Sequence, residues 1–182
     1  MRSIDKHDWS RLNRLQLGKY AEYLPKMEFL LCGCDVFTSE VDSHGIDFVV
    51  RAQQGEHYDI QVKSFRVETG KGAPYVFLQK AKFNPHPSLL LVLVHFVKGE
   101  PPILYLLRSW VGNSHNPLFE SRDYGDGKKS PPEWGLTLSK KKLATLAQDY
   151  SFDAVVKTLM RGSREISGDI VAPAGEKWNV DE

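Results

Sequence analysis

The strongest hydrophobic signal along the chain is an apolar run over residues 89–97, interrupted only by His95. An unbroken run predicts a strand buried on both faces, because a half-solvated strand would alternate apolar and polar residues. We interpret His95 as a core residue rather than a ligand. A second apolar run, residues 103–110, follows a short turn with two prolines. The two runs predict an antiparallel hairpin at the centre of a sheet.

Helical spacing of apolar residues extends over residues 8–32, with Asp8 or Ser10 as the candidate N-cap and Gly33 as the stop. Pro25 lies inside this segment and predicts a kink or a split, because proline removes a backbone donor. The positions expected to form the buried stripe share one predicted helix face. They are Leu12, Leu15, Tyr20, Leu24, Met27 and Leu31.

Residues 45–64 predict two short strands joined by a polar turn near Gln54. That turn places Asp47 on the first strand opposite Gln61 on the second. Gln61 and Lys63 share one strand face, because strand side chains alternate in direction. An acid in a strand is costly to bury without a partner, which makes Asp47 a candidate functional residue. The competing interpretation is an aspartate that caps the preceding turn.

Other segments complete the predicted elements. Residues 35–40 predict a strand, and residues 112–133 predict a long loop-rich segment. Helices are expected over residues 136–150, capped by Ser139, and over residues 152–160.

The 182-residue length is sufficient for one domain with a sizeable core. We expect this domain to span residues 1–160, followed by a tail over residues 161–182 that is flexible or ordered on contact. The formal net charge of +1 means that nucleic-acid contact must come from a local basic patch. The N-terminus lacks a signal-peptide pattern and no apolar run reaches the length of a membrane span, which predicts a soluble, cytoplasmic protein with no membrane partner.

Three motifs follow one another in a specific order. The pattern G-x-x-A-E runs from Gly18 to Glu22, G-I-D ends at Asp47, and Q-V-K spans residues 61–63. In this order and spacing they resemble the PD-(D/E)XK nuclease superfamily, and more closely its Holliday-junction-resolvase-like and Mrr-type restriction endonuclease-like domains. The resemblance covers residues 18–110. It implies an α/β, restriction-endonuclease-like core with a mixed sheet of about five strands flanked by helices.

The resemblance also implies a site chemistry. Glu22, Asp47, Gln61 and the backbone carbonyl of Val62 would hold Mg²⁺, with Mn²⁺ as a substitute, through oxygen ligands. Lys63 would polarise the attacking water and stabilise charge on the phosphate. Glu22, Asp47, Gln61 and Lys63 are therefore the candidate catalytic residues. Gln61 stands where Glu is commoner, which lowers the negative charge, favours one metal ion over two and leaves an inactive relative as an alternative.

Basic residues near these motifs are candidate nucleic-acid contacts. Arg66 and Lys71 lie in a Gly-rich segment after the Q-V-K strand, and Lys80 and Lys82 alternate with aromatic residues. A plain surface loop and a core strand explain the same residues equally well. The leading hypothesis is a metal-dependent endonuclease acting on DNA, and a homodimer would supply the two sites that cutting both strands needs. The alternatives are an inactive module that binds nucleic acid or a protein partner, and an unrelated α/β scaffold.

Overall fold

The computed structural model describes residues 6–38, 45–68, 70–125 and 130–161. The helical segments are the 3-10 turn η1 (Trp9–Arg11), α1 (Arg14–Leu31), α2 (Lys140–Asp149) and α3 (Phe152–Arg161). The strands are β1 (Asp35–Phe37), β2 (Phe48–Arg51), β3 (His57–Arg66), β4 (Tyr75–Gln79), β5 (Leu89–Phe96), β6 (Ile103–Arg108), β7 (Trp110–Val111), β8 (Ser114–His115), β9 (Glu120–Arg122) and β10 (Glu133–Thr137). The predicted tail lies outside the described residues except for Arg161, the last residue of α3.

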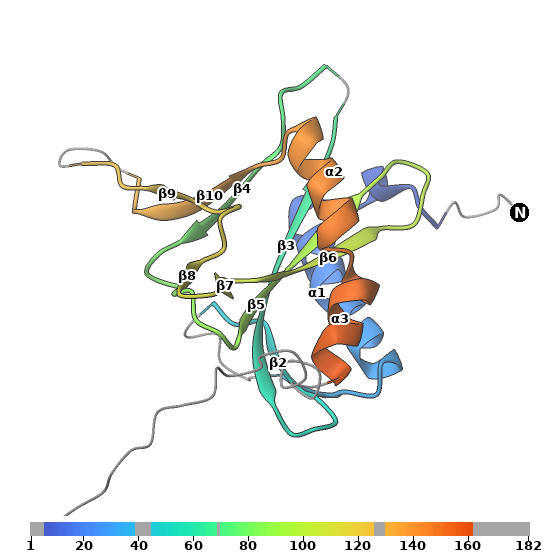
Figure 1. Cartoon of the computed structure of the whole chain (residues 1–182). Coiled ribbons are helices and arrows are strands. Elements are labelled where there is room, and N and C mark those ends of the chain that lie inside the picture. The colour runs from blue at the N-terminus through green and yellow to red at the C-terminus, as the bar shows by residue number, and fades with distance from the viewer. Residues whose placement is uncertain (1–5, 39–44, 69, 126–129, 162–182) are drawn as a thin grey trace, which may run out of the picture.

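A five-stranded mixed sheet forms the centre of the fold, in the order β1-β2-β3-β5-β6. β3 and β5 run parallel, and the other neighbours are antiparallel. A three-stranded sheet, in the order β4-β10-β9, and a β7–β8 ribbon accompany it. Figure 1 shows the three-stranded sheet on the left of the view and the helices on the right. The predicted α/β class with about five strands is confirmed.

The central sheet is buried on both faces, as β5 shows most directly. Leu90 and Val92 point to a core that α1 and α3 cover. Leu91 and Leu93, the alternate positions, point to a second core formed with β4, β10 and α2. The apolar run over β5 is therefore a strand with two buried faces, as predicted.

α1 packs on the sheet through a different stripe from the one predicted. Asn13 caps the helix in a reciprocal capping box with Gln16, so the helix begins later than Asp8 or Ser10. The buried positions recur every four residues and are Leu17, Ala21, Pro25 and Phe29. Helix α1 continues through Pro25 without a break, so the helix is not split there.

The predicted stripe on α1 was therefore wrong. Leu15 and Leu31 are 85% and 82% exposed, and Met27 is also exposed. Leu12 and Leu24 are only partly buried against the core. Both sides of this segment carry apolar residues, so periodicity alone does not identify which side meets the sheet.

The β2–β3 hairpin has the predicted register. Phe48 pairs with Ile60, and the backbone nitrogen of Asp47 donates to the carbonyl oxygen of Ile60 at 2.9 Å. Asp47 therefore lies opposite Gln61. Gly55 closes the turn with a φ of 98°, a conformation that side chains disfavour.

The β5–β6 hairpin was predicted correctly in its pairing and wrongly in its position. β5 and β6 are antiparallel neighbours, but β6 is an edge strand and β3 occupies the centre. The segment predicted as a long loop, residues 112–133, contains β8, β9 and the first residue of β10. These short strands are hard to recognise in the sequence because β9 and β10 are held by pairing with each other and with β4.

Candidate functional site

The C-terminal part of β3 extends past the start of β2, so the edge of β3 that faces β2 is open there. The β2 pairing starts at Phe48 opposite Ile60, so residues 62–66 extend past the described end of β2. The Oδ2 of Asp47 accepts a hydrogen bond from the backbone nitrogen of Val62 at 2.6 Å. The N–H and C=O groups of one strand residue point to the same side, so the Val62 carbonyl also faces this edge. The Asp47 side chain therefore adds a hydrogen bond to β3 just beyond the backbone pairing of β2.

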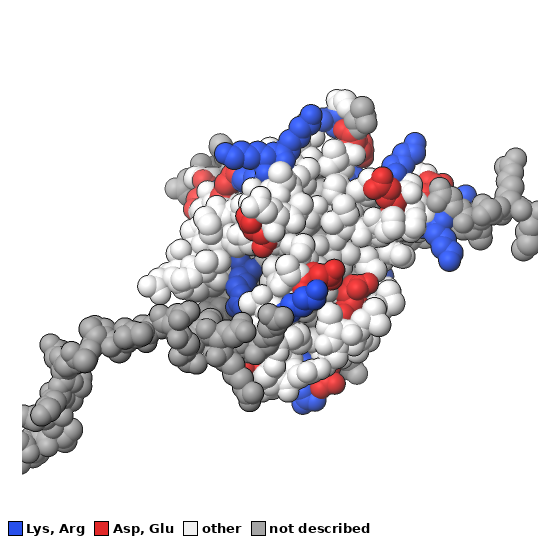
Figure 2. Space-filling model, turned by 45° about the vertical axis from the view of Figure 1, so that its right-hand side comes forward, with Lys and Arg blue, Asp and Glu red and all other residues white. Residues whose placement is uncertain are grey.

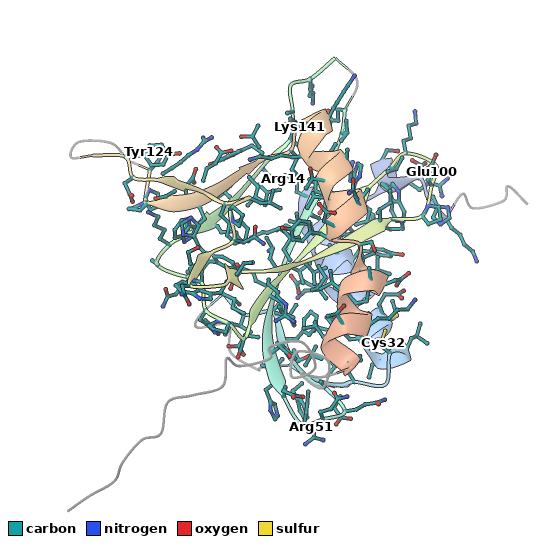
Figure 3. The ribbon with its side chains drawn as sticks, viewed as in Figure 1. Arg14, Cys32, Arg51, Glu100, Tyr124 and Lys141 are labelled. Carbon is teal, nitrogen blue, oxygen red and sulfur yellow. The ribbon has the colours of Figure 1, made fainter. Side chains whose placement is uncertain are left out.

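A pocket of about 560 Å³ lies along this edge. One wall comes from Leu12 and α1, and the other from β3 and the residues beside it. The lining residues are Leu12, Arg14, Leu17, Gly18, Ala21, Glu22, Asp47, Val62, Lys63, Ser64, Phe65, Arg66 and Glu68. Figure 3 labels Arg14 at the pocket end of α1, with Cys32 and Arg51 toward the opposite end of the molecule. The structure thus brings Glu22, Asp47, Val62 and Lys63 to one pocket.

The lysine and the glutamate reach this pocket from opposite sides of the sheet. Lys63 pairs in register with Leu93, so its side chain leaves β3 on the face of the second core. Glu22 stands on α1, which covers the other face. Both side chains line the pocket at the open edge beside Val62.

Gln61 is a buried side chain that does not line the pocket, although it precedes Val62 on β3. It is 6% exposed, and its Oε1 has no hydrogen-bond partner among the described residues. A Cβ placed on Gly45 would approach Nε2 of Gln61 to 3.2 Å and Cβ of Lys82 to 3.1 Å. Because Gly45 also has a φ of 71°, a side chain there would be strained and would press on Gln61. Gly45 therefore leaves room for Gln61 at the start of the open edge.

Glu22 is half-buried and forms an ion pair with Lys19, one turn earlier on α1. The hydrogen bond to Glu22 raises the pKa of Lys19, and the negative charge of Asp47 adds to that rise. Lys19 is thus a cation held against the carboxylate of Glu22. A metal ion binding to Glu22 would compete with this ammonium group.

The site offers ligand atoms of the type that a hard divalent cation prefers, namely oxygens. Glu22 and Asp47 offer carboxylates, the Val62 carbonyl faces the same edge, and the Oε1 of Gln61 is a buried acceptor without a partner among the described residues. Within the described ranges, no group of three His, Cys, Asp or Glu side chains could hold a metal ion. A cation here would therefore need the amide and backbone oxygens as well as the two carboxylates.

The predicted nucleic-acid contacts lie in different surroundings. Arg66 lines the pocket, and Lys82 lies against Gly45 and Gln61. Lys71 pairs with Glu68 on the loop after β3. Lys80 directly follows β4 of the three-stranded sheet. Its Nζ is 2.8 Å from both carboxylate oxygens of Asp123 and lies over the Trp134 ring. Arg66 and Lys82 are thus next to the candidate site, whereas Lys80 is held in an ion pair of the second sheet.

The motifs do not point to several residues in or near the pocket. Arg14 on α1, and Ser64 and Glu68 on or after β3, line it. Lys19 does not line it but pairs with Glu22. Arg14 and Glu22 stand two helical turns apart, and this spacing was a usable signal because residues four apart share a helix face.

Charge is not gathered by sign on the face shown in Figure 2. Acidic and basic side chains occur there in small groups separated by wide uncharged areas. This agrees with the net charge of +1. Among the helices of the described residues, none has the length and apolar character needed to cross a membrane.

Comparison with known proteins gives structural similarity but no sequence match. No protein-family model matches the chain, and no curated protein matches it. Among solved structures, it is similar to the bacterial homing endonuclease I-Ssp6803I, with 16% sequence identity and a TM-score of 0.49 over 85% of this chain and 97% of that one. A similarity of this size does not bear on function, so the functional argument rests on the pocket itself.

Proposed function

We propose that this chain is a metal-dependent nuclease of the PD-(D/E)XK type that hydrolyses phosphodiester bonds, with DNA as its substrate. The observation that carries the proposal is the single pocket that Glu22, Asp47, Val62 and Lys63 line at the open edge of β3. Two carboxylates, a backbone carbonyl and an ammonium group are the functional groups that metal-assisted phosphodiester hydrolysis needs.

Under this proposal, each residue of the site has a distinct role in catalysis. Glu22, Asp47, the Oε1 of Gln61 and the carbonyl of Val62 would hold Mg²⁺. When bound, the cation supplies a Lewis acid for the phosphate and makes water more acidic. Lys63 would hold the attacking water and donate to the phosphate oxygens as negative charge develops there. Arg66, on the same pocket wall, would donate to the phosphate backbone and fix the position of the strand.

The test is cleavage of supercoiled plasmid in Mg²⁺, in Mn²⁺ and in EDTA. Wild type should nick plasmid only with a divalent cation, and Lys63→Met should slow nicking by about 100-fold, in line with the loss of one preorganised charge-stabilising donor. Lys157→Met, on the exposed surface of α3, is the matched control and should cut like wild type. Equal nicking by Lys63→Met and wild type would refute the assignment of Lys63.

A second candidate function is a catalytically inactive module that binds nucleic acid. It is favoured by the pairing of Glu22 with Lys19 and by the lack of a third acidic, His or Cys ligand among the described residues. Such a module would bind an oligonucleotide equally well with EDTA and with Mn²⁺. It would cut neither plasmid, a four-way junction, single-stranded DNA nor RNA.

A further inference from the structure

A second hollow, of about 300 Å³, adjoins the candidate site. Arg66 and Glu68 line both cavities, so the two hollows meet at the end of β3. From this shared wall the second hollow continues to Trp9 and Phe96. A bound strand leaving the site past Arg66 would therefore enter this hollow.

The side chain of Arg66 has unused hydrogen-bonding capacity at this junction. Its Nη2 donates to the carbonyl oxygen of Trp9 at 2.9 Å. Its Nε is buried and has no hydrogen-bond partner among the described residues. A guanidinium group carries five N–H donors, and an unpaired buried donor is costly to keep. Because Arg66 lines both hollows, its remaining guanidinium N–H groups can donate to an anionic group at their junction.

The second hollow itself is suited to an aromatic group with polar edges rather than to a bare anion. Val67 and the small exposed parts of Trp9 and Phe96 provide apolar surface. Polar and charged groups come from Asp8, Ser10, Glu68 and Lys98. The Trp9 side chain is held in place, because its indole N–H donates to the carbonyl oxygens of Val97 and Glu100 at 2.8 and 3.2 Å. Nucleobases combine flat apolar faces with hydrogen-bonding edges, and proteins bind them on such surfaces.

We propose that the second hollow holds the base of the nucleotide adjoining the scissile phosphate, while Arg66 donates to the phosphate that joins the two nucleotides. This rests on the proposed nuclease function and adds to it a specific strand path, from the pocket at Asp47 past Arg66 toward Trp9. The hollow then recognises one nucleotide at a fixed distance from the cut.

The first test needs no variant. The cut position is mapped on a DNA duplex of 30 base pairs, and a single abasic nucleotide is then moved through the flanking positions. The expected result is a loss of about tenfold in kcat/KM at one position beside the cut and little change elsewhere, because one base loses its contacts. Equal rates at every position would overturn the proposal.

The second test fills the hollow. Val67→Trp is compared with Val111→Trp, since these valines are 51% and 47% exposed and Val111 lies in a different cavity beside α3. Val67→Trp should bind the intact duplex about tenfold more weakly by fluorescence anisotropy in EDTA, and its cleavage should no longer depend on the abasic position. Val111→Trp should match wild type in both measurements, with circular dichroism confirming that both variants fold.

The outcomes separate the two proposals. If wild type cuts DNA but shows no position dependence, or if Val67→Trp behaves like Val111→Trp, the hollow does not hold a base and the nuclease function stands. If wild type neither cuts nor binds any nucleic acid, both proposals are refuted.

Discussion

The carboxylate of Asp47 accepts a hydrogen bond from the backbone nitrogen of Val62 at 2.6 Å, and this contact closes the β2–β3 pairing beside the candidate site. Asp47 therefore has a structural role that is separable from a metal-binding role. Asp47→Ala should cost about 1–3 kcal/mol of unfolding free energy, because it leaves the Val62 N–H without that acceptor. Asp47→Asn keeps an acceptor and should stay within about 1 kcal/mol of wild type.

Metal binding should be impaired in both variants, in contrast to stability. Both lack the carboxylate charge, so both should lose Mn²⁺ affinity by roughly tenfold or more. Urea denaturation in EDTA measures the structural role, and Mn²⁺ titration followed by electron paramagnetic resonance measures the other. If Asp47→Asn binds Mn²⁺ as tightly as wild type, Asp47 serves only to hold the strand edge.

Packing of α1 gives a prediction about stability alone. Phe29 is fully buried between the sheet and α3, where its ring lies 4.9 Å from that of Phe152 and edge-on to it, whereas Leu31 is 82% exposed. Phe29→Ala should lower the free energy of unfolding by about 3–5 kcal/mol, because it opens a cavity in the core. Leu31→Ala should change it by less than about 0.5 kcal/mol. Urea midpoints of the two variants test this, and a large loss in Leu31→Ala would mean that the helix is rotated.

The sequence predicts the helices and strands better than it predicts which of their sides are buried and which strands pair. The register of β2 and β3 was predictable because a polar turn with Gly55 fixes which residues face each other. The buried side of α1 was not predictable, because Leu15 and Leu31 are as apolar as Leu17 and only the sheet distinguishes them. The three-stranded sheet was missed for a related reason: β9 has three residues, too few to show a period of its own.

The candidate site was predictable as a set of residues but not as a geometry. Motif order selected Glu22, Asp47 and Lys63, which the structure brings to one pocket. Sequence alone did not show that β3 has an open edge at Val62, because that depends on where β2 begins. It also did not show that Lys19 pairs with Glu22, although their spacing of three residues on a helix permits it.

His95 gives a pH dependence with a defined sign. Burial lowers the pKa of His95 from its ordinary value of 6.5, and its Nδ1 has no hydrogen-bond partner among the described residues. The unfolded chain therefore takes up this proton near pH 6.5, while the folded chain takes it up only at lower pH. The free energy of unfolding should fall as the pH drops below 6.5, and His95 should add no slope above it.

The comparison variant for this pH effect is His95→Phe, which keeps a ring to stack on Phe65, now 4.5 Å away. Urea denaturation between pH 5 and pH 7.5 should show a shallower loss of stability in His95→Phe than in wild type below about pH 6.5. Parallel curves for the two proteins would mean that other groups produce the acid sensitivity.

Under the proposed function, Gln61 should influence how strongly the site holds a cation. Its buried Oε1 lacks a partner among the described residues, and Asp47 lies opposite it across the hairpin. Gln61→Glu would place a second carboxylate next to Asp47, so the two like charges should destabilise the metal-free protein. The same charge should raise Mn²⁺ affinity by about tenfold or more, because a hard cation prefers carboxylate ligands. Mn²⁺ should therefore restore the stability that Gln61→Glu loses in EDTA.

Gln53→Glu, at an exposed turn position, is the control. It adds the same charge away from the pocket and should change neither the stability nor the Mn²⁺ affinity. Calorimetric Mn²⁺ titration of the three proteins is the measurement, and equal affinities would exclude the Gln61 oxygen from the metal site.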